Sequence, residues 1–296
     1  MKHIYLLGSI NTDLVIETPY IPKEGETLTG NNFFIAGGGK GANQAIAIRR
    51  NGNSNLSFLS SVGNDSFGKE QLLNFSKEGI DTKDIKILND TSTGSAIIIL
   101  CNNDNRIILN KGANDKISKD DVISFLSNAK EGDIFLTQLE NNIEVTSFAL
   151  EYAKKEKKMT VILNPAPMNK KIIDYLKYVD ILIPNETELE LLGGLDYITS
   201  NCNIKTLIVT LGGKGYRIIN KDKDETYPAI KIKPVDTTSA GDTFVGIFVS
   251  LYSLDVDIYK ACRFASIGAS IACLSYGAQP SIPTKEQIEE YIKNNL

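Results

Sequence analysis

Short apolar runs alternate with amphipathic helical stretches along most of the chain, and this alternation constrains the fold more than any other feature. It favours a mostly parallel sheet, because parallel neighbours need a crossover that is usually a helix. The predicted strands are Ile4–Gly8, Ser57–Val62, Ile134–Thr137, Thr160–Asn164, Ile181–Ile183 and Thr206–Thr210. The predicted helices are Gly41–Arg50, Ser66–Glu78, Asp120–Ala129, Ile143–Lys155, Glu186–Leu192, Thr243–Tyr252, Ile258–Leu274 and Lys285–Asn294. We expect residues 1–296 to form a single α/β domain with helices flanking the sheet.

Two segments interrupt this alternation, at residues 12–36 and 93–110. The first holds short strand-like pieces separated by prolines and glycines, and the second predicts a hairpin of Ile97–Leu100 against Ile107–Leu109 around a turn at 102–105. Together they predict a small antiparallel sheet that acts as a lid. Because neither arm of the hairpin alternates apolar and polar residues, we expect the main domain or a ligand to cover one face and a second copy of the chain to cover the other. The alternative is an ordinary extension of the main sheet.

Composition argues against several classes of function. Hydrophobic residues make up 42% of the chain, as in globular proteins, and a net charge of −4 disfavours a nucleic-acid partner. No apolar run reaches membrane-spanning length, and the N-terminus turns polar at Ser9 too early for a signal peptide. We therefore expect a cytoplasmic protein with no membrane association and with four reduced cysteines. The single histidine, His3, appears at the start of a predicted strand, which argues against a Ser-His-Asp triad.

The segment Val235–Phe244 carries the strongest indication of function. Small residues precede Asp242, and an apolar helical run follows, so Asp242 should lie in the first turn of a buried helix. Free backbone N–H groups favour an anion there, and Ala240 and Gly241 would let a phosphate approach the backbone. Asp242 would then be a proton acceptor for an attacking alcohol, as a small-molecule kinase requires. The alternative is an aspartate that only complements the dipole of its helix.

A glycine-rich segment, Gly37–Gln44, carries the second indication. It is not a Walker A loop, because Phe34 stands where that motif needs glycine and Gly41 stands where it needs Ser or Thr. It predicts a tight turn into a helix, with Lys40 and Asn43 pointing into one pocket. The alternative is a glycine turn with a lysine that faces solvent.

Polar residues recur at the carboxyl ends of the predicted strands, where open α/β sheets bind ligands. Asn11 and Asp13 follow the first strand and could hydrogen-bond vicinal hydroxyls, Glu140 follows the third, and Asn164 ends the next. Taken singly, each is more typical of a turn. Their recurrence at one edge favours a pocket.

Two further turns could serve a nucleotide. Asn185–Glu188 offers carboxylates at a helix start that could hold hydrated Mg²⁺ near phosphates, although acids also suit helix N-termini in general. Thr210–Gly215 gives an amide-rich turn that could lie against a nucleotide.

Taken in order, these segments resemble the ribokinase-like family of carbohydrate kinases. Its two signature regions match at Gly38–Gln44 and Asp236–Phe244, and other matches span nearly the whole chain. The other matching pieces are Gly8–Asp13, Gly25–Thr27, Gly112–Asn114, Gln138–Glu140, Asn164–Pro167, Pro184–Glu188 and Gly277–Ser281. The resemblance implies a Rossmann-like fold with a small β-sheet lid, and transfer of the γ-phosphoryl group of ATP to the 5-hydroxyl of D-ribose.

The resemblance also implies roles for individual residues. Asp242 would be the catalytic base, and the amides of Ala240, Gly241 and Asp242 would form an anion hole. The implied sugar contacts are Asn11, Asp13, Gly39, Lys40, Asn43, Glu140 and Asp242. The implied nucleotide contacts are Asn185, Thr210, Gly212, Gly215, Gly241 and Ser266, with Glu188 acting on Mg²⁺.

A monovalent cation, K⁺, and a homodimer formed through the lid are further implications. The cation is expected near Asp236, Thr238, Ala272, Ser275, Gly277 and Ser281. The chain departs from the family where Ser239 replaces the more usual Gly or Ala, and where Ser266 replaces a histidine that some relatives place near the adenine. These departures leave the nucleotide preference open. The short link from Leu192 to Lys205 predicts a shortened helix.

Alternatives of two classes remain at this stage. Within the kinase class, the substrate could be deoxyribose, a nucleoside or another sugar, although Asn11 with Asp13 favours ribose. In a different class, the chain could be a sugar-binding protein without catalysis. That interpretation predicts the loss of the acid at position 242, which the sequence retains.

Overall fold

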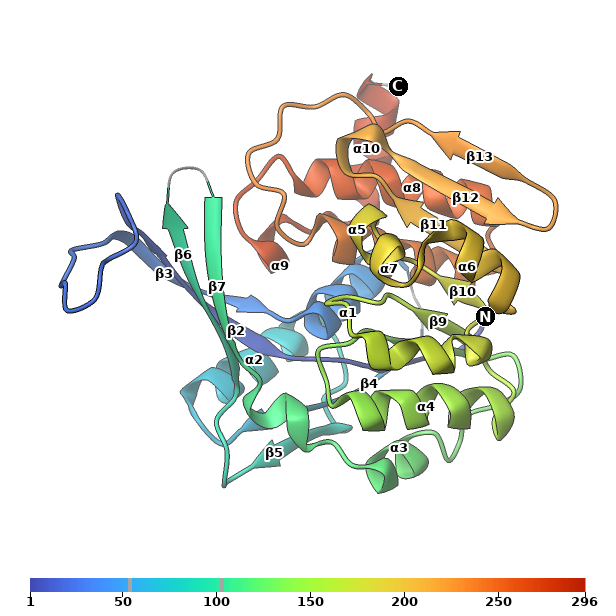
Figure 1. Cartoon of the computed structure of the whole chain (residues 1–296), viewed down its shortest axis with the longest axis horizontal. Helices are drawn as coiled ribbons and strands as arrows, with labels where there is room; N and C mark the ends of the chain where they lie inside the picture. Colours follow the sequence, from blue (N-terminus) through green and yellow to red (C-terminus); the bar gives the residue numbers. More distant parts are fainter. Residues whose placement is uncertain (53–54, 102–103, 296) are drawn as a thin grey trace.

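The computed structural model describes residues 1–52, 55–101 and 104–295. Within these residues a nine-stranded sheet runs through the middle of the molecule (Figure 1). Its strands, in spatial order, are β13 (Asp224–Tyr227), β12 (Tyr216–Asn220), β11 (Thr206–Thr210), β10 (Ile181–Leu182), β9 (Thr160–Leu163), β8 (Ile134–Thr137), β1 (Ile4–Leu7), β4 (Leu56–Gly63) and β5 (Ile85–Leu88). Neighbours pair in parallel except at β11–β12 and β12–β13. The predicted α/β fold is confirmed, and β5, β12 and β13 extend the sheet beyond the six predicted strands.

Both faces of the central strands are buried, which explains why β1 and β8–β11 are largely apolar. In β1, Ile4 and Leu6 pack into one hydrophobic cluster, whereas Tyr5 and Leu7 pack into another. Successive side chains of a strand point to opposite faces, so the two clusters lie on opposite sides of the sheet.

Helices cover the two faces. The first cluster includes residues of α1 (Lys40–Arg50), α2 (Ser66–Lys77), α7 (Ala240–Ser253), α8 (Ile258–Ala272) and α10 (Lys285–Asn295). The second includes residues of α3 (Lys119–Phe125), α4 (Ile143–Lys155), η2 (Lys170–Tyr178), α5 (Glu186–Leu191) and α6 (Gly194–Asn201). The short helical turns are η1 (Gly112–Lys116), η3 (Gly212–Lys214) and α9 (Ala278–Ser281). None of the helices in the described ranges is both long and apolar enough to cross a bilayer.

Some helix bounds differ from those that the sequence predicts. Helix α7 begins at Ala240, three residues before the predicted start, because the helical backbone takes in the small residues that precede Asp242. Helix α3 ends at Phe125 instead of Ala129. The link from Leu192 to Lys205, for which a shortened helix is expected, contains the eight-residue α6.

A second, four-stranded sheet forms the lid and projects away from the main body (Figure 1). Its strands, in spatial order, are β3 (Asn31–Gly38), β2 (Asn11–Glu17), β6 (Gly94–Cys101) and β7 (Asp104–Asn110). The prediction of an antiparallel sheet is wrong in one respect, because β2 and β6 pair in parallel. The chain passes through the main domain between these two strands, so it returns to the lid in the same direction. Of the predicted turn at 102–105, Asp104 and Asn105 belong to β7, and 102–103 lie outside the described residues.

Candidate active site

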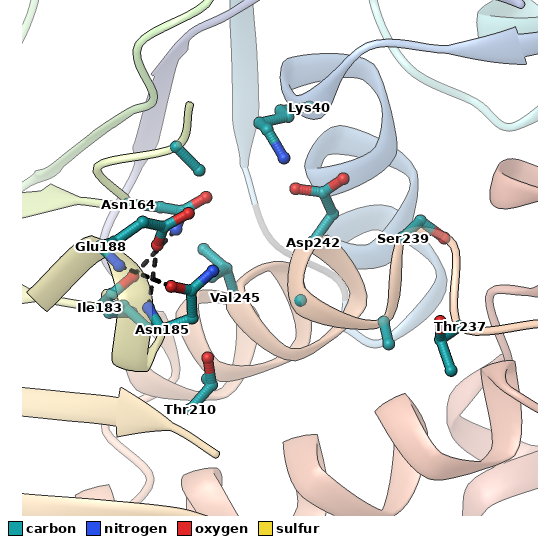
Figure 2. Close-up of a pocket in the computed structure, with 13 residues that line it drawn as sticks. Lys40, Asn164, Ile183, Asn185, Glu188, Thr210, Thr237, Ser239, Asp242 and Val245 are labelled. Carbon is teal, nitrogen blue, oxygen red and sulfur yellow. Dashed lines mark hydrogen bonds between the residues drawn. The ribbon is translucent and has the colours of Figure 1, made fainter. Parts of the chain in front are cut away.

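A cavity of about 240 Å³ opens between the N-terminus of α7 and the loops that follow β9, β10 and β11. Figure 2 shows polar side chains from these separate segments pointing into it. Its lining consists of Lys40, Asn164, Ala166, Ile183, Asn185, Glu188, Thr210, Thr237, Ser239, Ala240, Gly241, Asp242 and Val245. Of the polar residues predicted at the carboxyl ends of the strands, Asn164 lines this cavity, whereas Asn11, Asp13 and Glu140 do not belong to its lining.

Asp242 lies in the first turn of α7, as predicted, and is 6% exposed. The first backbone N–H groups of a helix have no intrahelical acceptor, so the amides of Gly241 and Asp242, two residues that line the cavity, remain available as donors. The amide of Ala240 donates only a long bond of 3.3 Å, to the Thr237 carbonyl. A Cβ added to Gly241 would meet no atom within 4 Å, so there is room for a ligand against this backbone.

Two amide side chains of α1 hold the carboxylate of Asp242. Asn43 Nδ2 donates to Oδ2 at 2.9 Å, and Gln44 Nε2 donates to Oδ1 at 3.2 Å. Lys40 extends its amino group toward the same carboxylate (Figure 2). Asp242 has the largest effect on Lys40 and raises the pKa of its ammonium group, outweighing burial, which lowers it. Lys40 lines the cavity, whereas Asn43 does not belong to its lining and meets Lys40 at the carboxylate of Asp242.

The glycine turn before α1 brings the lid close to this centre. Gly39 has φ +90°, a conformation that favours glycine. A Cβ added to Gly38 would stand 2.4 Å from both carboxylate oxygens of Asp13, so only glycine accommodates that side chain. Burial, followed by the negative charges of Glu140 and Asp242, raises the pKa of Asp13 to about 7. The charges of two other predicted sugar-contacting carboxylates thus contribute to the raised pKa of Asp13.

Glu140 and Asn11 join the same group of polar side chains. Glu140 Oε2 accepts hydrogen bonds from Ser9 Oγ and, at 3.0 Å, from the backbone nitrogen of Lys40. Asn11 is buried, and its Oδ1 accepts a 2.8 Å bond from Asn114 Nδ2. The structure therefore gathers the predicted sugar-contacting residues around the start of α1, beside Asp242.

The predicted nucleotide residues are only partly brought together. Asn185, Glu188, Thr210 and Gly241 line the cavity. Asn185 and Glu188 form a capping box, with Asn185 N donating to Glu188 Oε2 at 2.9 Å. Burial has the largest effect on Glu188 and raises the pKa of its carboxyl group, although the bond from Asn185 opposes this.

The other three predicted nucleotide residues lie outside the lining of this cavity: Gly212, Gly215 and Ser266. Gly215 has a structural reason to be glycine, because an added Cβ would stand 2.0 Å from the carbonyl oxygen of Tyr227. Ser266 is buried in α8.

The residues predicted for a cation lie on two segments that Asp236 joins. Its Oδ1 accepts bonds from the nitrogen and hydroxyl of Thr238, and its Oδ2 accepts from the nitrogen of Gly277 at 3.0 Å. Burial alone would raise the pKa of Asp236, but these bonds hold it below its ordinary value. Ser281, in α9, donates to the carbonyl of Ala278.

His3 does not form a triad. Its Nε2 lies 2.9 Å from Ser57 Oγ, but Asp133 accepts from the backbone nitrogen of His3 and not from its ring. His3 lies just before β1, where its partly buried ring contacts that of Tyr5, and this burial lowers the pKa of the ring.

The model of the pfkB family of carbohydrate kinases matches residues 1–285. The chain belongs to this family. It is 38% identical to a ribokinase of Haemophilus influenzae and 36% identical to a deoxyribokinase of Salmonella typhi, with 99% of both chains covered in each case. The structure of an Arabidopsis thaliana ribokinase complexed with ribose and ATP superposes with a TM-score of 0.86 at 30% identity, covering 99% of each chain. The protein is therefore an ATP-dependent carbohydrate kinase, as the motifs predicted.

In this pfkB-family kinase, one residue at the centre of the site was not assigned from the sequence. Gln44 contacts Asp242 as directly as Asn43 does, and it also reaches Asn164. Its position next to Asn43 at the start of a helix was the available indication. However, residues i and i+1 of a helix usually face different directions, so the sequence gave no reason to place both on one carboxylate.

Proposed function

We propose that this pfkB-family kinase transfers the γ-phosphoryl group of ATP to the 5-hydroxyl of D-ribose, giving D-ribose 5-phosphate and ADP. The observation that carries the proposal is the position of Asp242. Its buried carboxylate stands between the polar group at the start of α1 and the cavity at the amino end of its own helix. The ribose and ATP in the Arabidopsis thaliana ribokinase support the choice of both substrates.

In the proposed reaction the sugar oxygen forms a bond to the γ-phosphorus, and the bond from that phosphorus to the bridging oxygen of ADP breaks. The hydroxyl proton passes to Asp242. The amides of Ala240, Gly241 and Asp242 stabilise negative charge on the transferring group, and Lys40 adds a positive charge close by. Because the transition state for phosphoryl transfer is loose, most of the acceleration comes from alignment and from this anion hole.

The choice of ribose over deoxyribose rests on Asn11 and Asp13. Asn11 accepts a hydrogen bond from Asn114, and the carboxylate of Asp13 lies against Gly38. A pocket built to hydrogen-bond a hydroxyl rejects an analogue that lacks it, because its polar groups are left unpaired. The deoxyribokinase relative makes 2-deoxyribose the second candidate. Rates on ribose, 2-deoxyribose and a panel of nucleosides, measured side by side, would decide between them.

The nucleotide is proposed to contact Asn185, Thr210, Gly212, Gly215, Gly241 and Ser266. Mg²⁺ is proposed to enter with it, near Glu188. The described residues contain no cluster of three or more His, Cys, Asp or Glu able to hold a metal, which suits an ion that keeps water and phosphate ligands. When bound, Mg²⁺ would neutralise charge on the phosphates. The half-buried Glu188 carboxylate fits this role because it lines the cavity and supplies hard oxygen.

K⁺ is proposed to bind where Asp236 joins the segments 235–239 and 273–277. The residues proposed to surround it are Asp236, Thr238, Ala272, Ser275, Gly277 and Ser281, whose oxygens are of a kind that suits such an ion. Ser239 links this region to the anion hole, because it precedes Ala240 and its Oγ donates to the carbonyl of Ala278. An ion that orders these segments would supply electrostatic support to the turn before α7.

The lid is proposed to form a homodimer contact. Large apolar side chains are exposed on its strands, among them Phe33, Ile107 and Ile108, the last at 62%. Burying such side chains against a second copy is favourable. Sedimentation should show a dimer for the protein and a monomer for Ile108→Asp, and a monomeric unmodified protein would contradict this contact.

We further propose that the whole chain is one domain with the lid as an appendage, and that it works in the cytoplasm. There its four free cysteines would stay reduced and ATP is available. A sugar-panel kinase assay with and without K⁺ tests the function as a whole. Ribose should be the best acceptor and K⁺ should raise its rate, whereas sugar binding without ATP turnover would support the non-catalytic alternative.

A further inference from the structure

A chain of buried amide side chains runs from the centre of the main sheet to the proposed base. Gln138 and Gln44 are both 0% exposed. Gln138 Nε2 donates to Gln44 Oε1, and Gln44 Nε2 donates to Asn164 Oδ1 at 3.1 Å and to Asp242 Oδ1 at 3.2 Å. Buried polar groups with several fixed partners are rigid, because every alternative arrangement leaves a donor or acceptor unpaired.

The orientation of each amide in this series is set by two groups that can only accept, the backbone carbonyl of Ile183 and the carboxylate of Asp242. Asn164 Nδ2 donates to the backbone carbonyl of Ile183 at 2.9 Å, so Asn164 turns its oxygen toward Gln44. The carboxylate of Asp242 is also an acceptor. Gln44 therefore has to present its nitrogen to both, and its oxygen is left to receive the nitrogen of Gln138. One orientation of each amide satisfies these bonds, and the opposite orientation of Gln44 would set oxygen against oxygen.

Close backbone packing brings Gln44 to this position. Gly246 lies one turn after Asp242 on α7, and a Cβ added to it would stand 2.7 Å from the carbonyl oxygen of Gln44 and 2.5 Å from Ala47 Cβ. Residues i and i+4 share a helix face, so the missing side chain lets α1 approach α7 where Asp242 projects. The two helices thus make their close contact at Gly246 and Gln44, next to Asp242.

The two oxygens of Asp242 have different partners. Oδ1 faces the fixed Gln44, whereas Oδ2 accepts from Asn43, a proposed sugar contact whose own Oδ1 is buried without a partner. We propose that Gln44 is a positioning residue for the base. It fixes Oδ1 in place, so that Oδ2 is presented to the sugar hydroxyl when Asn43 exchanges its bond to Asp242 for a bond to the sugar. This inference rests on the proposed role of Asp242 in phosphoryl transfer.

Two substitutions test it against a matched control. Gln44→Met keeps the length of the side chain but removes its donor, and Gln44→Glu places a second carboxylate beside Asp242. The control is Ser250→Ala, which removes a different buried bond between the same helices, from Ser250 Oγ to the carbonyl of Ile48 at 3.2 Å. Any effect of loosening the α1–α7 contact in general should appear in the control as well.

We expect kcat for ribose to fall about ten- to a hundredfold in both Gln44 variants, because misplacing a reacting group by a fraction of an ångström to 1 Å has effects of this size. KM for ATP should change less than about threefold. The acid limb of the kcat–pH profile should move upward by about one pH unit, more for Glu than for Met, because the ionised carboxylate has lost a donor. In Ser250→Ala, kcat and the profile should stay as in the unmodified protein.

A loss of kcat with an unmoved pH profile, or an equal loss in Ser250→Ala, would overturn the positioning role. A readout that needs no activity keeps the test separate from the proposed function. In a crystal structure of ligand-free Gln44→Met, the Asp242 carboxylate should rotate or occupy two conformers, and a single unchanged conformer would contradict the inference. If the unmodified protein phosphorylated no sugar while this rotation was seen, the proposed function would fail and the positioning of Asp242 by Gln44 would stand.

Discussion

Asn43 on α1 donates a 2.9 Å hydrogen bond to Asp242 on α7, so the starts of the two helices that border the site are joined through the proposed base. One helix follows the glycine turn that reaches the lid, and the other begins at the proposed anion hole. In the proposed reaction the sugar and the phosphate would therefore meet at this carboxylate.

Replacing that carboxylate by an amide should stop the reaction and leave the fold intact. We expect Asp242→Asn to lower kcat by about 10²- to 10⁴-fold, the usual contribution of a positioned base. Ribose binding measured by calorimetry should change little, because the amide keeps the shape and part of the hydrogen bonding. Turnover close to that of the unmodified protein would remove Asp242 from the role of base.

Substitution of Gly241 should lower activity without lowering stability. An alanine there meets no atom within 4 Å and suits a helix, so thermal unfolding of Gly241→Ala should match the unmodified protein or rise slightly. Its methyl group would occupy the space next to the anion hole, so we expect kcat to fall at least about tenfold. Full activity in this variant would show that the phosphoryl group does not approach this backbone.

The raised pKa of Asp13, about 7, predicts how sugar binding depends on pH. Above pH 7 the carboxylate is ionised and accepts hydrogen bonds from sugar hydroxyls, so KM for ribose should fall as pH rises from 6 to 8.

The raised pKa of Asp13 also lowers the stability of the free protein. The carboxyl group of Asp13 keeps its proton in the folded state up to about pH 7, but releases it in the unfolded state near its ordinary pKa of 3.8. The contribution of Asp13 to the free energy of unfolding therefore falls as pH rises from about 4 to 7.

Asp13→Asn serves as the control for this pH dependence, since an amide does not titrate. The slope of KM against pH between 6 and 8 should flatten in that variant, while kcat keeps its own profile. An unchanged slope would assign the pH dependence to another group.

Asp236 should control the response to K⁺. Asp236→Ala removes the acceptors for Thr238 and Gly277, so the two segments lose their side-chain link through Asp236 and keep the bonds to the carbonyls of Cys273 and Ala278. We expect the rate increase on titration with KCl to disappear and the basal rate to fall about tenfold, as for other losses of alignment. Asp257→Ala is the control, because it removes another aspartate, the exposed N-cap of α8, and should leave the K⁺ response intact.

The parts of the site that the sequence predicts are those carried by a local pattern. Asp242 was placed at a helix start by two small residues and an apolar run, and Lys40 by a glycine turn. Gln44 lies about a hundred residues from both Gln138 and Asn164 in the sequence, and its contacts with them depend on how closely α1 packs against the ends of β8 and β9. No local pattern encodes that distance.

The same distinction holds for the fold. Apolar runs long enough to be buried on both faces predicted the central strands, but β12 and β13 at the edge of the sheet are partly exposed and lack that pattern. The parallel pairing of β2 with β6 joins segments about eighty residues apart, and hairpin rules describe only neighbouring strands. The small sheet was therefore located correctly and its hairpin of β6 with β7 is confirmed, while the parallel pairing of β2 with β6 was not predicted.

A crystal structure with ribose and a non-hydrolysable ATP analogue tests the central claim most directly. We predict the ribose 5-hydroxyl within about 3 Å of Asp242 Oδ2, in line with a γ-phosphate that the amides of Gly241 and Asp242 hydrogen-bond. A terminal phosphate bound away from the start of α7, or a sugar whose 5-hydroxyl faces another side chain, would contradict the account.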